Sequence, residues 1–226
     1  MVDLTTSELA DRLGVSSRHA VDLLARGIID GRRLASGAWL VDSDSVARYE
    51  SAARRGKGRT LDPATAWGLL WELSGLDAHW LTPRTRARVR SRIRDESVEA
   101  LARAVSARTR VHRFRAANAP KAMSGLIATG SAAAEHLGTG LMNDTRRVSG
   151  YLRDGGVEEY ARSHFLAAST GGPDLIYENT LPVAYDADAM PAAVIAADLV
   201  ASTDTRERAG GLRALAELRT AWLAAL

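Results

Sequence analysis

Cysteine is absent from the 226-residue sequence, and several classes of protein are excluded with it. Without thiols the chain forms no disulfide bond, uses no cysteine nucleophile and offers no thiolate to a metal. Long hydrophobic runs are also missing, since none approaches the roughly 18 residues that a membrane-spanning helix needs. The first ten residues are polar and acidic, unlike the basic and then apolar start of a secretory signal. We therefore expect a cytoplasmic protein without a membrane partner.

Histidine and lysine are scarce as well. No two histidines have the spacing of a metal site on a helix, so we expect no metal and no cofactor at His19, His79, His112, His136 or His164. The basic residues, nearly all arginine, are unevenly distributed. Residues 1–115 carry 21 Lys and Arg against 14 Asp and Glu, whereas residues 116–226 carry 9 against 13. A basic half predicts contact with a polyanion.

Residues 4–27 have the pattern of two short helices joined by a tight turn. Thr5 and Glu8 have the spacing of a capping box, and Gly14 is placed to end the helix that they begin. Ser16 is then an N-cap for a second helix, which we expect to run to Arg26. Helical spacing predicts buried side chains at Leu9, Ala10, Leu13, Ala20, Leu23 and Leu24. Two helices joined by a glycine turn form the helix-turn-helix pattern.

The second of these helices is the one expected to read DNA. Its N-terminus and exposed face carry hydrogen-bonding side chains, which are the groups that contact base edges in the major groove. Ser17, Arg18 and His19 are the first candidates for base contacts. The full set predicted to bind DNA from this helix is Ser16, Ser17, Arg18, His19, Asp22 and Arg26. The alternative is an ordinary helical hairpin whose polar face is only solvated.

Residues 28–52 predict a small wing followed by a helix. Strands are expected at 32–34 and 38–41, with glycine in the turn between them. The side chains near the tip of this wing, suited to phosphates or the minor groove, are Arg32, Arg33 and Ser36. The following helix would be capped by Asp42 or Ser43 and carry Val46, Ala47 and Tyr49. Residues 3–52 resemble the MerR and excisionase-like winged helix-turn-helix family, which implies a DNA-binding domain over residues 1–53.

A basic linker follows over residues 54–61, with cations interleaved with glycines at Arg54, Arg55, Lys57 and Arg59. Beside a DNA-binding domain these cations would add non-specific, salt-sensitive affinity. The alternative is a solvated hinge. Residues 62–226 then form the second domain, so the predicted fold class is mainly α with an α+β C-terminal domain behind an N-terminal winged helix-turn-helix.

Two helices are predicted early in the second domain, because Asp-Pro at 62–63 and Thr-Pro at 82–83 are helix starts. The first carries apolar packing residues at Trp67, Leu70 and Trp71. The second contains six arginines at alternate positions from Arg84 to Arg94. Alternation also fits an edge strand, but the Thr-Pro start and the spacing of the apolar residues favour a helix. Some of these arginines could meet DNA or an acidic partner, and the others would pair with Asp95, Glu96 and Glu99.

From about Thr109 the pattern alternates between short β-like runs and helices. Helices are expected near Pro120 and over residues 131–138, 157–166, 191–200 and 204–226, with strands over 111–116, 126–130, 146–153 and 174–185. The winged domain, the Thr-Pro-Arg helix and segments 128–138 and 190–215 are similar in order to the AbiEi antitoxins of type IV toxin–antitoxin systems. The resemblance implies an autorepressor that binds inverted repeats of double-stranded DNA, with a larger C-terminal domain that opposes a nucleotidyltransferase-like toxin. We expect a homodimer, because single helix-turn-helix units usually read two half-sites.

Candidate catalytic residues are few. Gly130-Ser131 with Asp186 and Asp188 resembles elements of nucleotidyltransferases, whose carboxylates hold a metal, but Ser131 and Asp186 are 55 positions apart. We therefore expect a sequence-specific DNA-binding transcriptional regulator, an autorepressing antitoxin rather than an enzyme. The alternatives are a nucleotidyltransferase-like enzyme targeted to nucleic acid and an excisionase-type architectural DNA binder of phage origin. The large second half argues against the excisionase.

Overall fold

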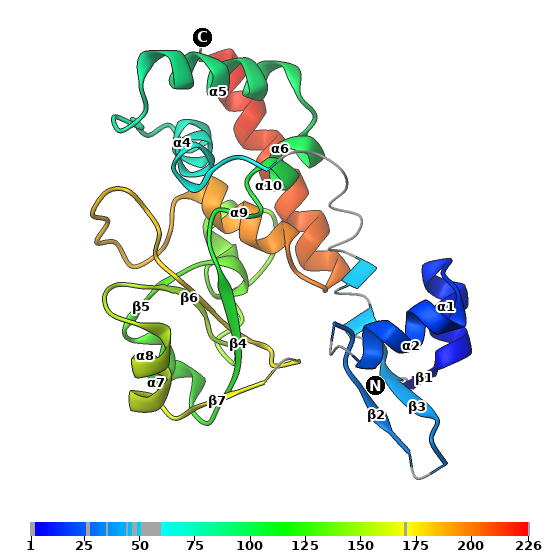
Figure 1. The fold of residues 1–226 in the computed structure, drawn as a ribbon. Coiled ribbons are helices and arrows are strands. Elements are labelled where there is room, and N and C mark those ends of the chain that lie inside the picture. The colour runs from blue at the N-terminus through cyan, green and yellow to red at the C-terminus, as the bar shows by residue number, and fades with distance from the viewer. Residues whose placement is uncertain are drawn as a thin grey trace. The chain divides into compact units, whose positions relative to one another are not determined.

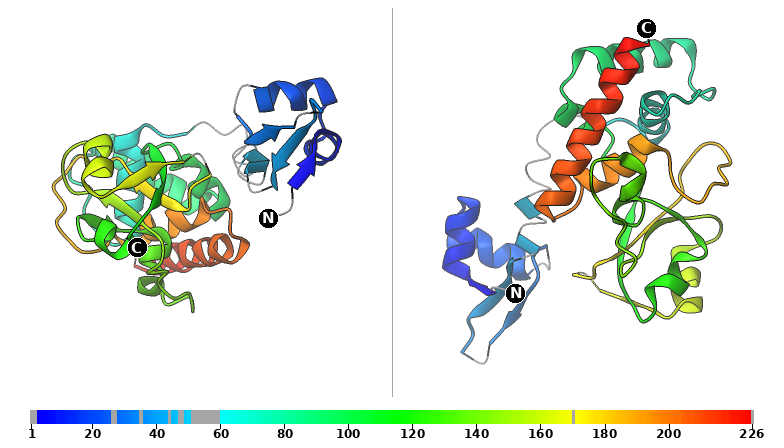
Figure 2. Two further views of the ribbon diagram at one scale, coloured as in Figure 1. Left: turned by 90° about the horizontal axis from the view of Figure 1, so that it is seen from below. Right: turned by 180° about the vertical axis from the view of Figure 1, so that it is seen from behind.

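The computed structural model describes residues 3–25, 28–34, 36–43, 45–46, 49–50, 60–169 and 171–225. The protein is of mixed α/β type, with a small N-terminal sheet and a five-stranded mixed sheet. Its chain divides into two compact units, residues 1–56 (unit 1) and 57–226 (unit 2), which are described separately (Figures 1 and 2). None of the helices in the described ranges is long and apolar enough to span a bilayer.

Unit 1 combines two helices with a three-stranded antiparallel sheet. Its elements in chain order are β1 (Asp3–Thr5), α1 (Thr6–Leu13), α2 (Ser17–Ala25), β2 (Gly31–Arg33) and β3 (Trp39–Asp42). The strand order is β1-β3-β2, so β3 is central. The described residues between positions 43 and 50 are also helical. The sequence pattern does not predict β1, because three residues are too few to show alternation.

The apolar residues expected on the two helices form the core of unit 1. Leu9 and Ala10 of α1 pack with Ala20, Leu23 and Leu24 of α2, and all five are buried, as predicted. Leu13 is only partly buried. Ile29, Val41 and Val46 complete the cluster from the chain after α2, and Tyr49 packs against it. Ala47 lies outside the described residues. This one cluster therefore joins the helices to the sheet.

Unit 2 builds helices around a five-stranded sheet. Its helices are α4 (Pro63–Leu73), α5 (Pro83–Asp95), α6 (Val98–Ala104), α7 (Ala119–Met123), α8 (Val157–Ser163), α9 (Ala192–Val200) and α10 (Thr205–Ala224). Its strands are β4 (Val111–Ala116), β5 (Leu126–Ala128), β6 (Ser149–Leu152), β7 (Leu166–Ala168) and β8 (Asp174–Tyr177). The strand order is β5-β6-β8-β4-β7, and of these pairs only β6 with β8 is parallel.

The two faces of this sheet carry different helices. Side chains alternate across a strand, so neighbouring residues enter different cores. Tyr151 and Tyr177 enter the larger core, which includes α4 and α9, whereas Leu152 and Ile176 enter a smaller core with α7 and α8. Figure 1 shows α7 and α8 together, away from α4 and α9. Unit 2 is therefore a helix, sheet and helix sandwich.

Several predictions from sequence are settled by these elements. The arginine-rich segment is a helix, α5, with Thr82 as N-cap, as predicted. The helix expected over 131–138 is wrong, since two 3-10 turns, at Gly130–Ala132 and Ala134–Leu137, stand there. The helix expected over 157–166 ends at Ser163, and the chain then enters β7, which the sequence does not predict. Both misses concern pieces of three or four residues, too short for a periodic pattern.

Candidate nucleic-acid interface

The turn between α1 and α2 is fixed by the interactions that the sequence predicts. The Glu8 carboxylate accepts a hydrogen bond from the Thr5 backbone N–H at 2.7 Å, and the Glu8 N–H donates to Thr5 Oγ1 at 3.3 Å. The Thr5 backbone bond, followed by the Thr5 hydroxyl bond, lowers the pKa of Glu8. At the other end Gly14 has φ 64°, the left-handed conformation that glycine adopts without a Cβ clash. The two ends of α1 are therefore set locally.

Helix α2 presents a polar surface opposite its buried stripe. Ser16 Oγ accepts from the His19 backbone N–H at 3.3 Å, which confirms Ser16 as the N-cap. Ser17, Arg18, His19 and Asp22 are all exposed. Arg18 and Asp22 are one turn apart and lie at the centre of the outward face, because Ala20, Leu23 and Leu24 occupy the other side. Four predicted contact residues thus share one helix, while Arg26 lies outside the described residues.

The hairpin after α2 separates the two arginines predicted at the wing. Gly37, with φ 85°, occupies the turn, where the Leu34 N–H donates to the Ala38 carbonyl at 2.8 Å. Arg32 pairs in register with Leu40 and Arg33 with Trp39. Because cross-strand partners share a face, Arg33 lies on the Trp39 face that packs against the helices and Arg32 on the opposite face. Neighbouring side chains alternate between the two faces of a strand, but the sequence does not tell which of the two arginines faces the helices.

Of the remaining candidates, the wing residues are described by the structure and the linker residues are not. Ser36 is exposed near the tip, and Arg33 Nε donates to the Gly37 carbonyl at 3.3 Å. This bond uses one of the five guanidinium N–H groups, so Arg33 retains donors for a phosphate. The four linker cations lie outside the described residues and stay predictions, namely Arg54, Arg55, Lys57 and Arg59.

In unit 2 the arginines of α5 fall into two groups. Arg86 and Arg90 reach Glu72 on α4, with 3.0 Å from Arg90 Nε to Glu72 Oε2, and Arg92 pairs with Glu96 at 3.4 Å. The Glu96 pairing is as predicted, whereas Glu72 is an unforeseen partner. Three arginines are exposed and form no ion pair within the described ranges, Arg84, Arg88 and Arg94. Half of the arginine series is thus used inside unit 2.

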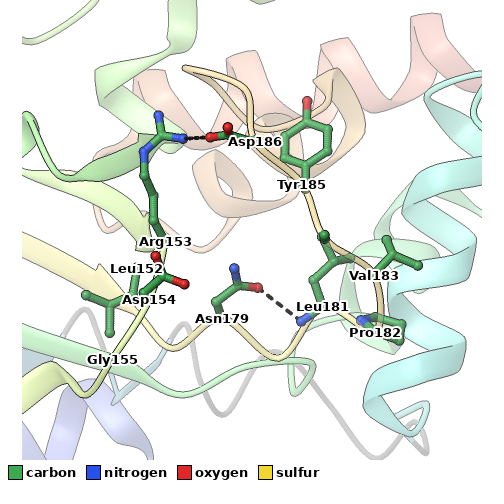
Figure 3. A pocket seen from close by; sticks show the side chains of 11 residues that line it. Leu152, Arg153, Asp154, Gly155, Asn179, Leu181, Pro182, Val183, Tyr185 and Asp186 are labelled. Carbon is green, nitrogen blue, oxygen red and sulfur yellow. Dashed lines mark hydrogen bonds and ion pairs between the residues drawn. The ribbon is translucent and has the colours of Figure 1, made fainter.

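A cavity of about 640 Å³ lies where the parallel strands β6 and β8 end (Figure 3). Its lining comes from the segment after β6 and from the loop after β8, and comprises Leu152, Arg153, Asp154, Gly155, Asn179, Leu181, Pro182, Val183, Ala184, Tyr185 and Asp186. The carboxyl ends of neighbouring parallel strands commonly border ligand sites. Here the Asn179 side-chain oxygen is engaged by the Leu181 N–H at 3.1 Å.

Of the two aspartates considered for a metal site, Asp186 lines this cavity, whereas Asp188 is not among the lining residues. Folding brings Asp188 beside β5, because the Ala128 N–H donates to the Asp188 carbonyl at 2.9 Å, two residues before Gly130. The long sequence separation is therefore no obstacle to a meeting. Both carboxylates, however, are fully exposed and pair with Arg153, at 2.6 Å from Asp186 and 3.5 Å from Asp188. Among the described residues no group of three His, Asp or Glu side chains is placed to hold a metal.

Unit 2 also contains a buried ion pair, which the sequence does not predict. Arg108 and Asp198 form an ion pair in the core, where Thr129 Oγ1 also donates to Asp198 at 2.6 Å. Burial raises the pKa of Asp198, and the charge of Arg108 opposes this rise. Burial lowers the pKa of Arg108, but Asp198 and Tyr151 more than compensate, so that pKa is raised overall. Because both side chains are at most 4% exposed, we assign them to stability and not to a ligand.

Among the described residues, the exposed hydrogen-bonding side chains of α2 are therefore the candidate nucleic-acid interface. Comparison of the chain with protein-family models, with curated proteins and with solved structures gave no match.

Proposed function

We propose that this protein is a sequence-specific DNA-binding transcriptional regulator, and that unit 1 is a winged helix-turn-helix. The observation that supports this most is α2, which exposes Ser17, Arg18, His19 and Asp22 while a capped turn and a buried stripe hold it in place. A helix with such a face near its N-terminus suits the major groove. The β2–β3 hairpin supplies cations for the phosphate backbone.

Arg18 is the residue on which the proposal depends most. Its guanidinium can donate two parallel hydrogen bonds to a guanine edge, which is the commonest specific contact in the major groove. Arg18→Ala should therefore weaken binding to the operator by roughly 1–3 kcal/mol while leaving binding to random DNA little changed. The measurement is a salt-titrated binding assay with the protein's own promoter region and a random duplex.

A matched control is Arg88→Ala, which removes another exposed arginine, from unit 2, and should not change the preference for the operator over the random duplex. Equal losses for the two variants, or undiminished operator selectivity in the Arg18 variant, would remove Arg18 from base recognition. Equal affinity of the unmodified protein for both duplexes would contradict sequence-specific regulation altogether.

We further propose that the protein represses its own operon as a homodimer and acts as an antitoxin. The support is the similarity in segment order to the AbiEi antitoxins. A reporter driven by the protein's own promoter should be repressed, and repression should require Arg18. Co-expression should also restore growth to cells that produce a toxin encoded beside it. Repression without growth rescue would support the proposed regulator and contradict the proposed antitoxin activity.

A further inference from the structure

Phe165, between α8 and β7, is an unusual residue for its position. Its φ is 56°, and no other non-glycine residue in the described ranges has a positive φ. L-residues adopt this conformation at a cost, and such strain tends to occur at functional sites. The ring gains little burial in return, since Phe165 is 73% exposed. Packing within unit 2 therefore does not explain why a large aromatic residue stands there.

The strand that follows Phe165 forms an open edge of the five-stranded sheet. At the opposite edge, the outward backbone groups of Ala128 in β5 are engaged, because the Met190 N–H donates to the Ala128 carbonyl at 2.8 Å and the Ala128 N–H donates to the Asp188 carbonyl. β7 instead pairs with β4 on one side and is the last strand in the order. Figure 1 shows β7 at the border of unit 2, next to α7 and α8.

The ladder between β4 and β7 shows which backbone groups face outward. The Ser169 N–H donates to the Arg113 carbonyl at 3.0 Å, which makes 113 and 169 a hydrogen-bonded pair. Such pairs alternate along an antiparallel ladder. The N–H and C=O groups of Leu166 and Ala168 therefore point away from β4. No described strand accepts them, so an extended chain could add there.

Two segments beside this edge carry cations and no carboxylates. Segments 111–126 and 160–173 contain no Asp or Glu, although residues 116–226 as a whole carry more carboxylates than cations. Lys121 Nζ lies 6.0 Å from the centre of the Phe165 ring, and Arg115 is opposite Ala167 in the register. Among the described residues, the one hydrogen-bond acceptor of the Arg162 side chain is the Glu158 backbone carbonyl, at 3.4 Å. Within the described part of the chain Arg115, Lys121 and Arg162 form no ion pair with a carboxylate.

We propose that the β7 edge, with Phe165, Arg115, Lys121 and Arg162, binds an extended acidic segment of a partner protein by strand addition. The outward groups of Leu166 and Ala168 would pair with the backbone of that segment, an apolar side chain would cover Phe165, and its carboxylates would meet the three cations. A peptide fits this surface better than a nucleic acid, because a nucleic acid has no backbone that complements a strand edge. The proposal does not depend on DNA binding by unit 1.

The test begins with a displayed library of random ten-residue peptides, selected against the full-length protein. Peptides that combine carboxylates with an apolar residue should be enriched. An enriched peptide, synthesised and added to isotope-labelled protein, should shift the amide signals of Leu166 and Ala168. No enrichment, enrichment without acidic residues, or shifts confined to other surfaces would overturn the proposal. If oligothymidylate displaced the peptide and shifted the amide signals of Leu166 and Ala168 itself, the surface would instead be a nucleic-acid site.

Substitutions at this surface distinguish a loss of peptide affinity from a loss of stability. Phe165→Asn places at φ 56° a residue that tolerates this conformation, so the unfolding temperature should not fall, while peptide affinity should drop roughly tenfold or more, as for aromatic anchors elsewhere. Ala168→Pro removes an outward N–H without breaking a bond to β4 and should also abolish binding. Lys121→Glu with Arg162→Glu should do the same, whereas Arg88→Glu, on α5, should not. A Phe165 variant that loses stability but keeps its affinity would show that the ring is only structural.

Discussion

At the scale of single residues, the buried ion pair of Arg108 with Asp198 is the interaction in unit 2 that the sequence does not predict. The two residues are 90 positions apart, so no local pattern in the sequence joins them. The available signal is the aspartate itself, which interrupts the otherwise apolar helix α9. The sequence does not tell which of the 28 arginines pairs with Asp198, because the pairing depends on how α9 packs against the segment before β4, where Arg108 lies.

Removing the carboxylate should destabilise unit 2 strongly. Asp198→Ala leaves the Arg108 guanidinium buried without its counter-charge, and breaking a buried pair in this way typically costs about 3–5 kcal/mol. Urea unfolding followed by tryptophan fluorescence measures this, since four of the five tryptophans lie in unit 2. The double variant Arg108→Met with Asp198→Leu removes both charges and should lose less. A double variant less stable than Asp198→Ala would contradict this explanation, because removing the unpaired guanidinium should relieve the cost of burying it.

At the scale of elements, helix starts were the most predictable feature. Thr5, Asp62 and Thr82 all act as N-caps, because each accepts a hydrogen bond from an N–H within the next three residues. Capping depends on nearest neighbours, so the sequence alone contains the information. β1 and β7 depend instead on distant strands, which is why three-residue segments gave no signal. The candidate interface followed the same division, since the exposed surface of α2 was predicted, whereas which of Arg32 and Arg33 faces the helices depends on how the hairpin packs.

The capping box of α1 makes a pH-dependent contribution to stability. Because hydrogen bonds from Thr5 lower the pKa of Glu8, the folded state favours the ionised carboxylate. This contribution is present above the ordinary pKa of glutamate and is lost as the pH falls through the lowered value. Thr5→Ala should raise the pKa of Glu8 only part of the way, since the backbone bond remains, and should cost α1 about 1 kcal/mol. Carbon-13 titration of Glu8 tests this, and an unchanged pKa would contradict a role for the hydroxyl.

At the scale of the whole molecule, the excess of positive charge in the first half of the chain does not lie in unit 1. Residues 1–56 carry 8 Lys and Arg against 8 Asp and Glu, so the excess in the first half belongs to residues 57–115. Those residues include half of the linker cations and the exposed arginines of α5. A division of labour follows for the proposed regulator, in which α2 discriminates among sequences and cations outside unit 1 supply much of the general attraction to DNA.

Lys57 tests this division most directly. As a phosphate contact it would release condensed counterions, so Lys57→Ala should reduce the slope of log affinity against log salt by roughly 0.9 on double-stranded DNA. The loss in affinity should be the same for the operator and for a random duplex, because phosphates are common to both. Arg18→Ala should show the opposite behaviour, a loss concentrated on the operator. A sequence-selective loss in the Lys57 variant would place that side chain among the groups that read bases, and an unchanged slope would remove Lys57 from the phosphate contacts.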